Sequence, residues 1–168
     1  MNRLNEIWRA GLTLRWHTTP ELYTSMDRCD GHSARMAKLI RVLHPDPTLG
    51  LIDAALVHDD GEISICDMRG PAKKAHPNIA AQVARVEEAH LVSMWGDTPA
   101  NIGRDGLLWI RFVDKLDAEV WARLHNPIYH ATEPDFARER EWMLGVVPRI
   151  VPVDKRQMVI DLIKGNTE

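Results

Sequence analysis

The sequence has few cysteines and no long apolar run, and each absence excludes a class of protein. Cys29 and Cys66 are the only cysteines among 168 residues, too few for a disulfide framework, so we expect a reducing, cytoplasmic compartment. No apolar run approaches the ~20 residues of a membrane span. Charges at Arg3, Glu6 and Arg9 interrupt the N-terminal segment, where a secretory signal needs an uninterrupted apolar stretch. We therefore expect no membrane partner.

The sequence also lacks a strong excess of charge of either sign. It has 21 lysines and arginines against 24 aspartates and glutamates, a net charge of −3, with the two signs interspersed. A nucleic-acid-binding surface carries a marked basic excess, so we expect no nucleic-acid partner. A small anionic ligand held by a few local cations is compatible with this composition. Histidine, in contrast, is abundant, with eight residues, and this directs attention to metal ligands.

The hydrophobic pattern is helical over most of the chain, and no alternating strand pattern lasts beyond a few residues. Helices are predicted over residues 3–11, 32–44, 48–59, 78–95, 104–125, 134–147 and 154–164. Residues 61–77 are punctuated by glycine and proline and are predicted to be mostly loop. Apolar residues make up 45% of the chain, enough to build a core at this length. We predict a single all-α domain that covers residues 1–168.

The sharpest local feature is the pair His58-Asp59 at the end of an otherwise almost wholly apolar helix. Burying a carboxylate beside an imidazole is unfavourable without a compensating partner, and a metal cation is one such partner. The alternative is that this helix ends at the surface and that its acidic continuation, HDDGE, is solvated. The pair alone does not decide between the two.

Two further residues favour the metal. His32 opens the preceding helix and shares a face with Met36 and Leu43, so it should point toward the core. Asp114 lies inside the long helix on a half-apolar face, where aspartate has poor helix propensity. Together with His58 and Asp59 they form a mixed nitrogen and oxygen set that suits one divalent transition ion such as Co, Mn or Zn.

The order of these residues resembles a known family. His32, then His58-Asp59, then Asp114 follow the H…HD…D signature of HD-domain phosphohydrolases, whose fold is an all-helical bundle. The resemblance implies that these four residues bind the metal. One departure is Gly31, because the most similar families commonly carry glutamate before the first histidine.

The resemblance extends beyond the metal ligands. The segment HDDGEISICD, followed by Pro71-Ala-Lys73, is similar to the HDxxE(x4)D…PxK stretch of bacterial 5'-deoxynucleotidases and of short phage-type dATP triphosphohydrolases. Arg15-Trp16 resembles the Arg-Trp pair that both groups carry before the first histidine. These matches imply a metal-dependent enzyme that hydrolyses the 5'-phosphoester of deoxynucleotides. We also expect a homo-oligomer.

Catalytic roles are predicted for two acidic residues of this segment. Glu62, about one turn past His58 if the helix continues, could position the attacking water or relay its proton. The resemblance implies a similar role for Asp67 at the leaving oxygen. The alternative for both residues is a solvated acidic loop.

Substrate contacts are predicted for three cations and one aromatic residue. Phosphate oxygens need fixed cations, and the candidates are Arg15, Lys73 and Arg111, the last being three residues before Asp114. In the similar families the tryptophan corresponding to Trp16 crowds the sugar 2' position, which implies a preference for deoxyribose. The alternative for Trp16 is an ordinary core residue.

The length of the phosphate chain stays open between two substrates. Three cations in one loop, Arg69, Lys73 and Lys74, favour a deoxynucleoside triphosphate such as dATP, with release of triphosphate. The alternative is a 5'-deoxynucleotidase that acts on monophosphates. A rival from a different class is a non-catalytic nucleotide-binding HD protein. The remaining histidines are expected at the surface or at helix ends: His17, His44, His76, His90, His125 and His130.

Overall fold

The computed structural model describes residues 3–65, 68, 70–96 and 102–166, and all regular elements in these ranges are helices. The all-α prediction is therefore confirmed. In chain order the elements are α1 (Arg3–Gly11), α2 (Pro20–Tyr23), α3 (Cys29–Leu43), α4 (Leu49–Val57), the 3₁₀ helix η1 (Asp60–Ser64), α5 (Gly70–Ala75), α6 (Pro77–Trp95), α7 (Gly103–His125), α8 (Pro127–Thr132), α9 (Pro134–Ile150) and α10 (Val153–Lys164).

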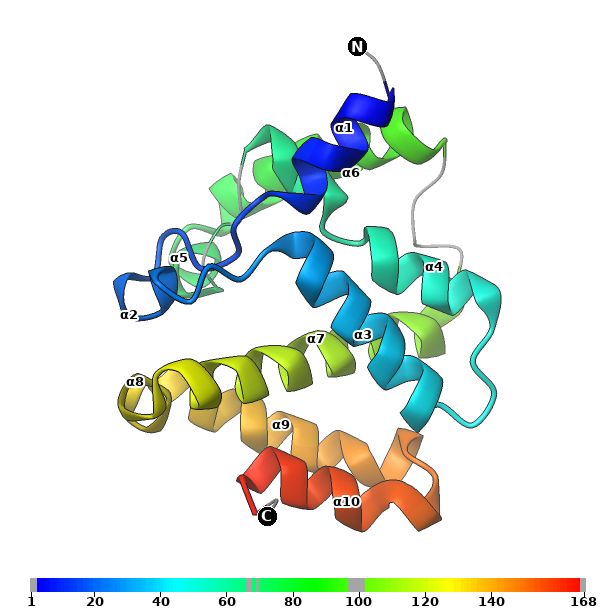
Figure 1. The fold of residues 1–168 in the computed structure, drawn as a ribbon, viewed down its shortest axis with the longest axis vertical. Coiled ribbons are helices and arrows are strands. Elements are labelled where there is room, and N and C mark those ends of the chain that lie inside the picture. The colour runs from blue at the N-terminus through cyan, green and yellow to red at the C-terminus, as the bar shows by residue number, and fades with distance from the viewer. Residues whose placement is uncertain (1–2, 66–67, 69, 97–101, 167–168) are drawn as a thin grey trace.

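Helix α7 lies at the centre, with α3 and α4 on one side and α9 and α10 on the other (Figure 1). Its residues Phe112, Val113 and Leu116 are fully buried and pack in one cluster with Met36 and Ile40 of α3. Each apolar side chain of this size contributes roughly 1.5–3 kcal/mol to folding when it is buried. The helix that carries Asp114 and the helix that carries His32 are thus fixed against each other by the core.

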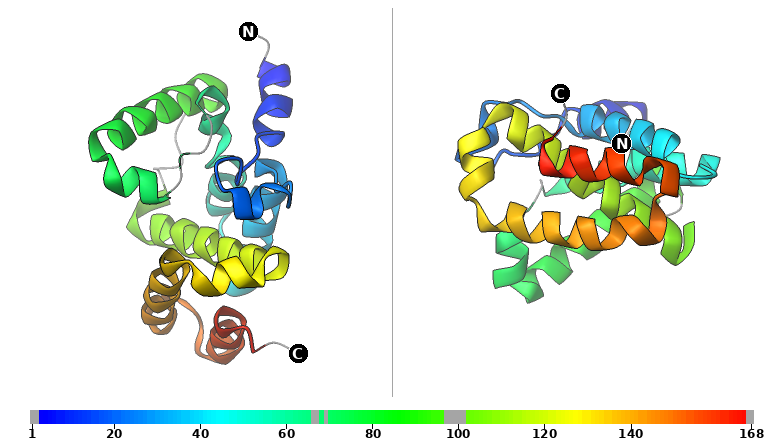
Figure 2. Two further views of the ribbon diagram at one scale, coloured as in Figure 1. Left: turned by 90° about the vertical axis from the view of Figure 1, so that its left-hand side faces the viewer. Right: turned by 90° about the horizontal axis from the view of Figure 1, so that it is seen from below.

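Close backbone packing positions η1. Helix α6 packs against η1 and α5, and α6 itself lies apart from α9 and α10 (Figure 2). A Cβ atom at Gly61 would lie 2.5 Å from the backbone oxygen of Glu87 on α6, so only glycine fits there. This approach fixes the backbone next to Glu62.

Most helix boundaries differ from the sequence prediction by one to three residues. Helix α3 begins at Cys29 and not at His32, which places His32 inside its first turn. Helix α6 begins at Pro77, with His76 as the N-cap, one residue before the predicted start at residue 78. Helix α9 continues through Pro148 to Ile150, three residues beyond its predicted end at residue 147.

Short helices account for the other differences. The segment 61–77 is not mostly loop, because it includes most of η1 and all of α5. The sequence prediction also missed α8, which starts at Pro127 and is capped by Asn126, whose side chain accepts a hydrogen bond from the backbone N–H of Tyr129 at 3.0 Å. Proline at the first helical position is compatible with a helix, since that N–H has no intrahelical partner anyway.

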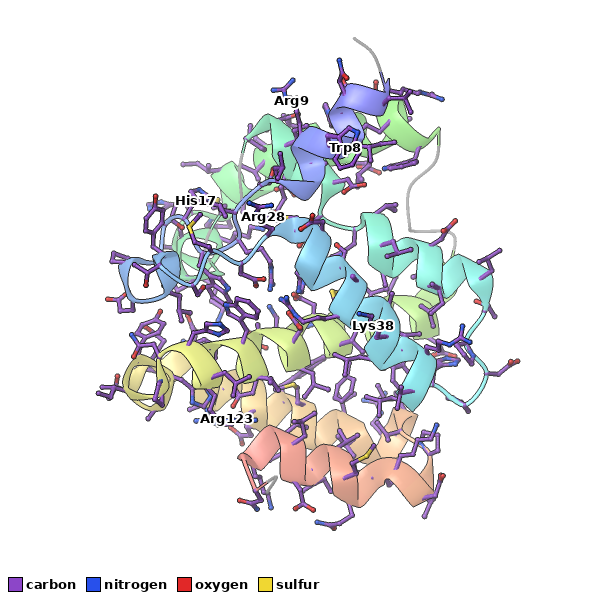
Figure 3. All side chains as sticks on the ribbon, viewed as in Figure 1. Trp8, Arg9, His17, Arg28, Lys38 and Arg123 are labelled. Carbon is purple, nitrogen blue, oxygen red and sulfur yellow. The ribbon has the colours of Figure 1, made fainter. Side chains whose placement is uncertain are left out.

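Helix α1 presents an exposed apolar stripe. Leu4, Trp8 and Leu12 are 66%, 75% and 52% exposed, and Figure 3 shows Trp8 on this helix near the N-terminus. The inward side of α1 instead buries Glu6 and Ala10. None of the helices in the described ranges is long and apolar enough to cross a membrane.

Candidate metal centre and adjoining pocket

Two imidazoles, one on α3 and one at the end of α4, lie next to each other. His32 is fully buried, and the ring centroids of His32 and His58 lie 5.2 Å apart. Nδ1 of His58 lies 3.0 Å from the carbonyl oxygen of Ala55, and Nδ1 of His32 lies 2.7 Å from a carboxylate oxygen of Asp117. Since these oxygens only accept, each Nδ1 carries a proton, and in the neutral ring each Nε2 therefore presents a lone pair.

Neither Nε2 atom makes a hydrogen bond, although both are buried. Leaving a buried polar atom unsatisfied costs about 1–3 kcal/mol. Two such atoms close together therefore indicate a ligand-binding site between His32 and His58. A divalent cation would satisfy both lone pairs at once.

Two carboxylates complete the group. Asp59 Oδ1 lies 3.1 Å from His58 Nε2, and Asp59 Oδ2 lies 3.6 Å from His32 Nε2. Asp114 Oδ1 lies 3.4 Å from His32 Nε2. The ligand atoms of His32, His58 and Asp59 all fall within 4.8 Å of one another. The four predicted metal ligands thus converge, and two nitrogens with two carboxylates fit a divalent transition ion.

Both carboxylates are ionised at neutral pH. Burial alone would raise the pKa of Asp59, but His58 outweighs it and holds that pKa well below its usual range. Burial would likewise raise the pKa of Asp114, but Lys115, His32 and Arg15 lower it. The centre therefore has two negative charges ready to bind a cation.

The pKa of His58 predicts how metal binding depends on pH. Burial would lower this pKa, but Asp59 outweighs burial and raises it. Without an ion, a raised imidazole pKa stabilises the folded protein below the unfolded value of about 6.5, and this contribution is lost as pH rises through the folded pKa. The ion needs the neutral ring, so metal affinity should rise with pH through the same range. Titration calorimetry with Mn²⁺ at about pH 6 and about pH 8 measures both the affinity and the proton release. Equal affinity at both values would contradict the assignment of His58.

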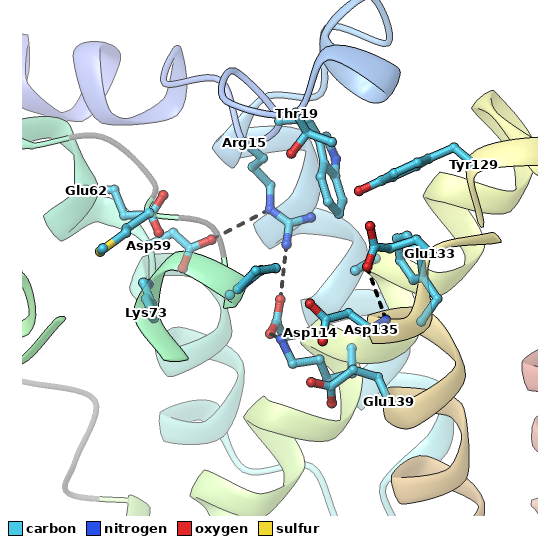
Figure 4. Close-up of a pocket in the computed structure, with 17 residues that line it drawn as sticks. Arg15, Thr19, Asp59, Glu62, Lys73, Asp114, Tyr129, Glu133, Asp135 and Glu139 are labelled. Carbon is cyan, nitrogen blue, oxygen red and sulfur yellow. Dashed lines mark hydrogen bonds and ion pairs between the residues drawn. The ribbon is translucent and has the colours of Figure 1, made fainter. Parts of the chain in front are cut away.

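Arg15 lies directly beside the centre. Its guanidinium nitrogens lie 3.1 Å from Asp114 Oδ1 and 3.9 Å from Asp59 Oδ2 (Figure 4). Burial would lower the pKa of Arg15, but Asp114, Asp59 and two further aspartates outweigh it and raise the pKa. Arg15 is therefore a permanent cation next to two predicted metal ligands.

Glu62 is placed next to the same centre by η1. Helix α4 ends at Val57, so Glu62 does not continue that helix but reaches the site through the 3₁₀ turn. It is buried, and its carboxylate belongs to a second group, with Asp59 and Cys29, whose ligand atoms lie within 4.8 Å of one another. Cys29 Sγ lies 3.9 Å from Glu62 Oε2. Asp67, the other predicted catalytic residue, lies outside the described residues.

A cavity of about 260 Å³ opens beside the centre. Three of the predicted substrate-binding residues, Arg15, Trp16 and Lys73, line it, as do Asp59 and Asp114 (Figure 4). Its opposite wall comes from α8 and α9, which contribute Tyr129, Glu133, Asp135, Phe136 and Glu139. We call this cavity the pocket.

The structure does not bring Arg111 to the pocket, which corrects its predicted role. Arg111 is exposed, and its guanidinium lies over the ring of Trp142 on α9, 4.4 Å from the ring centroid. Three residues along a helix leave a rotation of about 60° between side chains, enough for the aromatic ring to hold Arg111 on another side of α7. Lys115 lines the pocket instead, with Nζ 3.3 Å from Asp114 Oδ2.

The aromatic side of the pocket was only partly predicted. Trp16 lines the pocket and also packs against Phe136, with ring centroids 6.5 Å apart. Tyr129 packs edge-on against Phe136 at 5.9 Å. Tyr129 was missed because it lies on α8, which the hydrophobic pattern did not reveal.

His130 lies in the last turn of α8, so the helix-end part of its predicted placement holds, but it is not at the surface. It is buried, and its Nε2 lies 2.6 Å from Oε1 of Glu119, which also accepts a hydrogen bond from Arg140 at 3.1 Å. Glu119 lies on α7, 11 residues before His130 in the sequence.

The site is thus a group of two imidazoles, two ionised carboxylates and one arginine beside a pocket with an aromatic wall. Comparisons with known proteins gave no match to any family model, curated protein or solved structure.

Proposed function

We propose that this protein is a metal-dependent phosphohydrolase that cleaves the bond between the 5' oxygen and the first phosphorus of deoxynucleotides. The observation that carries the proposal is the pair of buried, unsatisfied Nε2 atoms of His32 and His58 beside two ionised carboxylates. The H…HD…D order of these residues in the sequence supports the same proposal.

The ion would be held by His32, His58, Asp59 and Asp114. When bound, it supplies a Lewis acid that polarises a phosphoryl oxygen and makes water a better nucleophile near neutral pH. Three of these residues come from α3, α7 and the end of α4, and the core holds the helices in fixed positions. The centre is therefore preorganised.

Arg15 is the residue best placed to bind the reacting phosphate. Its guanidinium lies next to Asp59 and Asp114, so a phosphate bound at the metal centre would contact the guanidinium. Its planar fork of donors matches phosphate oxygens. Lys73, on α5, adds a cation from another side of the pocket.

Glu62 is the proposed acid–base residue. Water attacks phosphorus, the bond to the 5' oxygen breaks, and the departing oxygen gains a proton, so the products are a deoxynucleoside and the free phosphate chain. A carboxylate near the attacking water can take up its proton. Glu62 lines the pocket next to Asp59, which is where this group is needed.

We consider two phosphate chain lengths for the substrate, and a different observation supports each. Lys73 and Lys74 lie together on α5, which supports a triphosphate whose tail extends along that helix. Lys74 is, however, paired with Asp135 at 3.0 Å, and Lys73 alone of the two lines the pocket, which supports a monophosphate. Arg69 lies outside the described residues.

Lys73→Ala distinguishes the two substrates. If the tail of a triphosphate lies along α5, the substitution should lower kcat/KM for dATP by about 10- to 150-fold, as for a lost charge-assisted contact, and change dAMP little. The control is Lys38→Ala, which removes an exposed lysine on α3 (Figure 3). Equal losses on both nucleotides, with dAMP the better wild-type substrate, would identify a 5'-deoxynucleotidase.

Trp16→Ala tests the proposed selection for deoxyribose. If the indole occupies the space of a 2'-hydroxyl, its removal should raise hydrolysis of ribonucleotides relative to deoxyribonucleotides by several-fold, because a steric barrier to the wrong substrate is removed. The ratio of kcat/KM for AMP and dAMP, or for ATP and dATP, measures the effect. A constant ratio with a lower melting temperature would restrict Trp16 to packing against Phe136.

A further inference from the structure

A buried carboxylate that the sequence did not single out contacts a metal ligand from behind. Asp117 lies on α7, one turn after Asp114, and is 5% exposed. Its Oδ2 accepts a hydrogen bond from Nδ1 of His32 at 2.7 Å. This contact keeps the proton on Nδ1 and aims the Nε2 lone pair at the centre.

Arg35 connects this carboxylate to a second one. Its Nε and one terminal nitrogen donate to the two oxygens of Asp117 at 2.6 and 2.9 Å. The same terminal nitrogen donates to Oδ1 of Asp27 at 2.8 Å. Arg35 also lies over the ring of Trp121, 4.3 Å from its centroid. It does not line the pocket.

Asp27 extends the connection to the substrate side. It is 3% exposed, and its Oδ2 accepts hydrogen bonds from Nε1 of Trp16 at 3.3 Å and from Arg15 at 3.4 Å. Asp27 therefore orients the two residues proposed to contact the sugar and the phosphate. One continuous chain of contacts runs from His32 to Trp16 through Asp117, Arg35 and Asp27, none of which lines the pocket.

We propose that Asp117, Arg35 and Asp27 are positioning residues that set the tautomer of His32 for metal binding and the orientation of Arg15 and Trp16 for substrate binding. This inference rests on the proposed metal centre. We call the three residues the positioning bridge. Both of its carboxylates contact the guanidinium of Arg35, and Asp27 also contacts that of Arg15, so the buried negative charges are paired with cations.

A second carboxylate on α7, Glu119, pairs with a histidine on α8 away from the pocket. Glu119 accepts from His130 and Arg140, which repeats the carboxylate, histidine and arginine of the positioning bridge. There the carboxylate contacts Nε2 of the histidine, and neither Glu119 nor His130 lines the pocket. Glu119 therefore offers a matched control only two residues from Asp117.

Asp117→Asn is the direct test. The amide can turn its NH₂ toward Nδ1 of His32 and thereby move the ring proton to Nε2, so affinity for Mn²⁺ should fall by about 10- to 100-fold, as for other groups that orient a metal ligand. Titration calorimetry measures the affinity. ¹⁵N NMR of the histidine rings in the metal-free protein reports the tautomer of His32 independently of any activity. Glu119→Gln, which removes the same charge, should change neither.

Arg35→Lys tests the substrate side and provides a milder variant should Asp117→Asn fail to fold. A single ammonium cannot bridge both carboxylates in the geometry of a guanidinium. We expect weaker Mn²⁺ binding, a shifted indole N–H signal of Trp16 and a raised KM.

Two results would overturn this inference and leave the proposed function standing. One is wild-type Mn²⁺ affinity and an unchanged His32 tautomer in Asp117→Asn. The other is an unperturbed Trp16 signal together with unchanged Mn²⁺ affinity in Arg35→Lys. A wild-type protein that binds no divalent ion would overturn the inference together with the proposed function.

Discussion

His58→Ala is expected to abolish bound divalent ion and phosphoester hydrolysis together. His58 supplies one of the two unsatisfied nitrogen atoms of the centre. A site that loses one of four ligands holds its ion weakly and gives it up on dialysis. Metal analysis of the purified variant should therefore fall from about one ion per chain to none, and turnover should fall to background.

His76→Ala is the matched control for this prediction. His76 is an exposed histidine at the start of α6 whose side chain makes no capping hydrogen bond. Its removal should leave metal content and turnover unchanged. A His58→Ala protein that keeps both its ion and its activity would end the assignment of the metal centre.

Glu62→Gln is expected to separate chemistry from binding. Glutamine keeps the size of the side chain beside Cys29 and Asp59 but cannot take up a proton. The variant should keep its ion and bind nucleotide nearly as the wild type does, while kcat falls by about two orders of magnitude or more. Single-turnover kinetics and a nucleotide titration measure the two effects separately.

Glu88→Gln, an exposed glutamate on α6, is the control and should behave as the wild type. Unchanged turnover with weakened binding in Glu62→Gln would make Glu62 a binding residue. The acid–base role would then have to lie elsewhere in the pocket.

The metal centre could be predicted because each of its residues conflicts with its local surroundings. A histidine and an aspartate end an apolar helix at His58 and Asp59, and Asp114 lies within a helix on a half-apolar face. Such conflicts are unfavourable unless something compensates for them, so they mark functional positions. The structure brings these residues together with His32 as the pattern predicts.

The positioning bridge carries the same kind of signal but was missed. Asp117 is also an aspartate inside α7, three residues after Asp114, and Arg35 is three residues after His32. What the sequence does not contain is the contact between them, which joins residues 82 positions apart. Sequence spacing predicts which residues share one face of a helix. It does not predict which face of another helix packs against them.

Competition between two possible contacts explains why the predicted position of Arg111 is wrong. The spacing from Asp114 suggested that Arg111 reaches the pocket, but an aromatic ring on α9 binds its guanidinium instead. Trp142 lies 31 residues further along the chain, and nothing in the local sequence of α7 reveals it. The long arginine side chain can reach either place, so the three-dimensional neighbourhood decides.

The most direct test is incubation of the Mn²⁺-loaded protein with each dNMP and dNTP in ¹⁸O-labelled water, with the products identified by ³¹P NMR and mass spectrometry. The proposed mechanism predicts a deoxynucleoside without label and a labelled phosphate or triphosphate, and no product with His58→Ala. A nucleotide that binds tightly but stays intact would identify a non-catalytic nucleotide-binding protein, and label in the deoxynucleoside would place the attack on carbon. Either result would contradict phosphoester hydrolysis at phosphorus by this site.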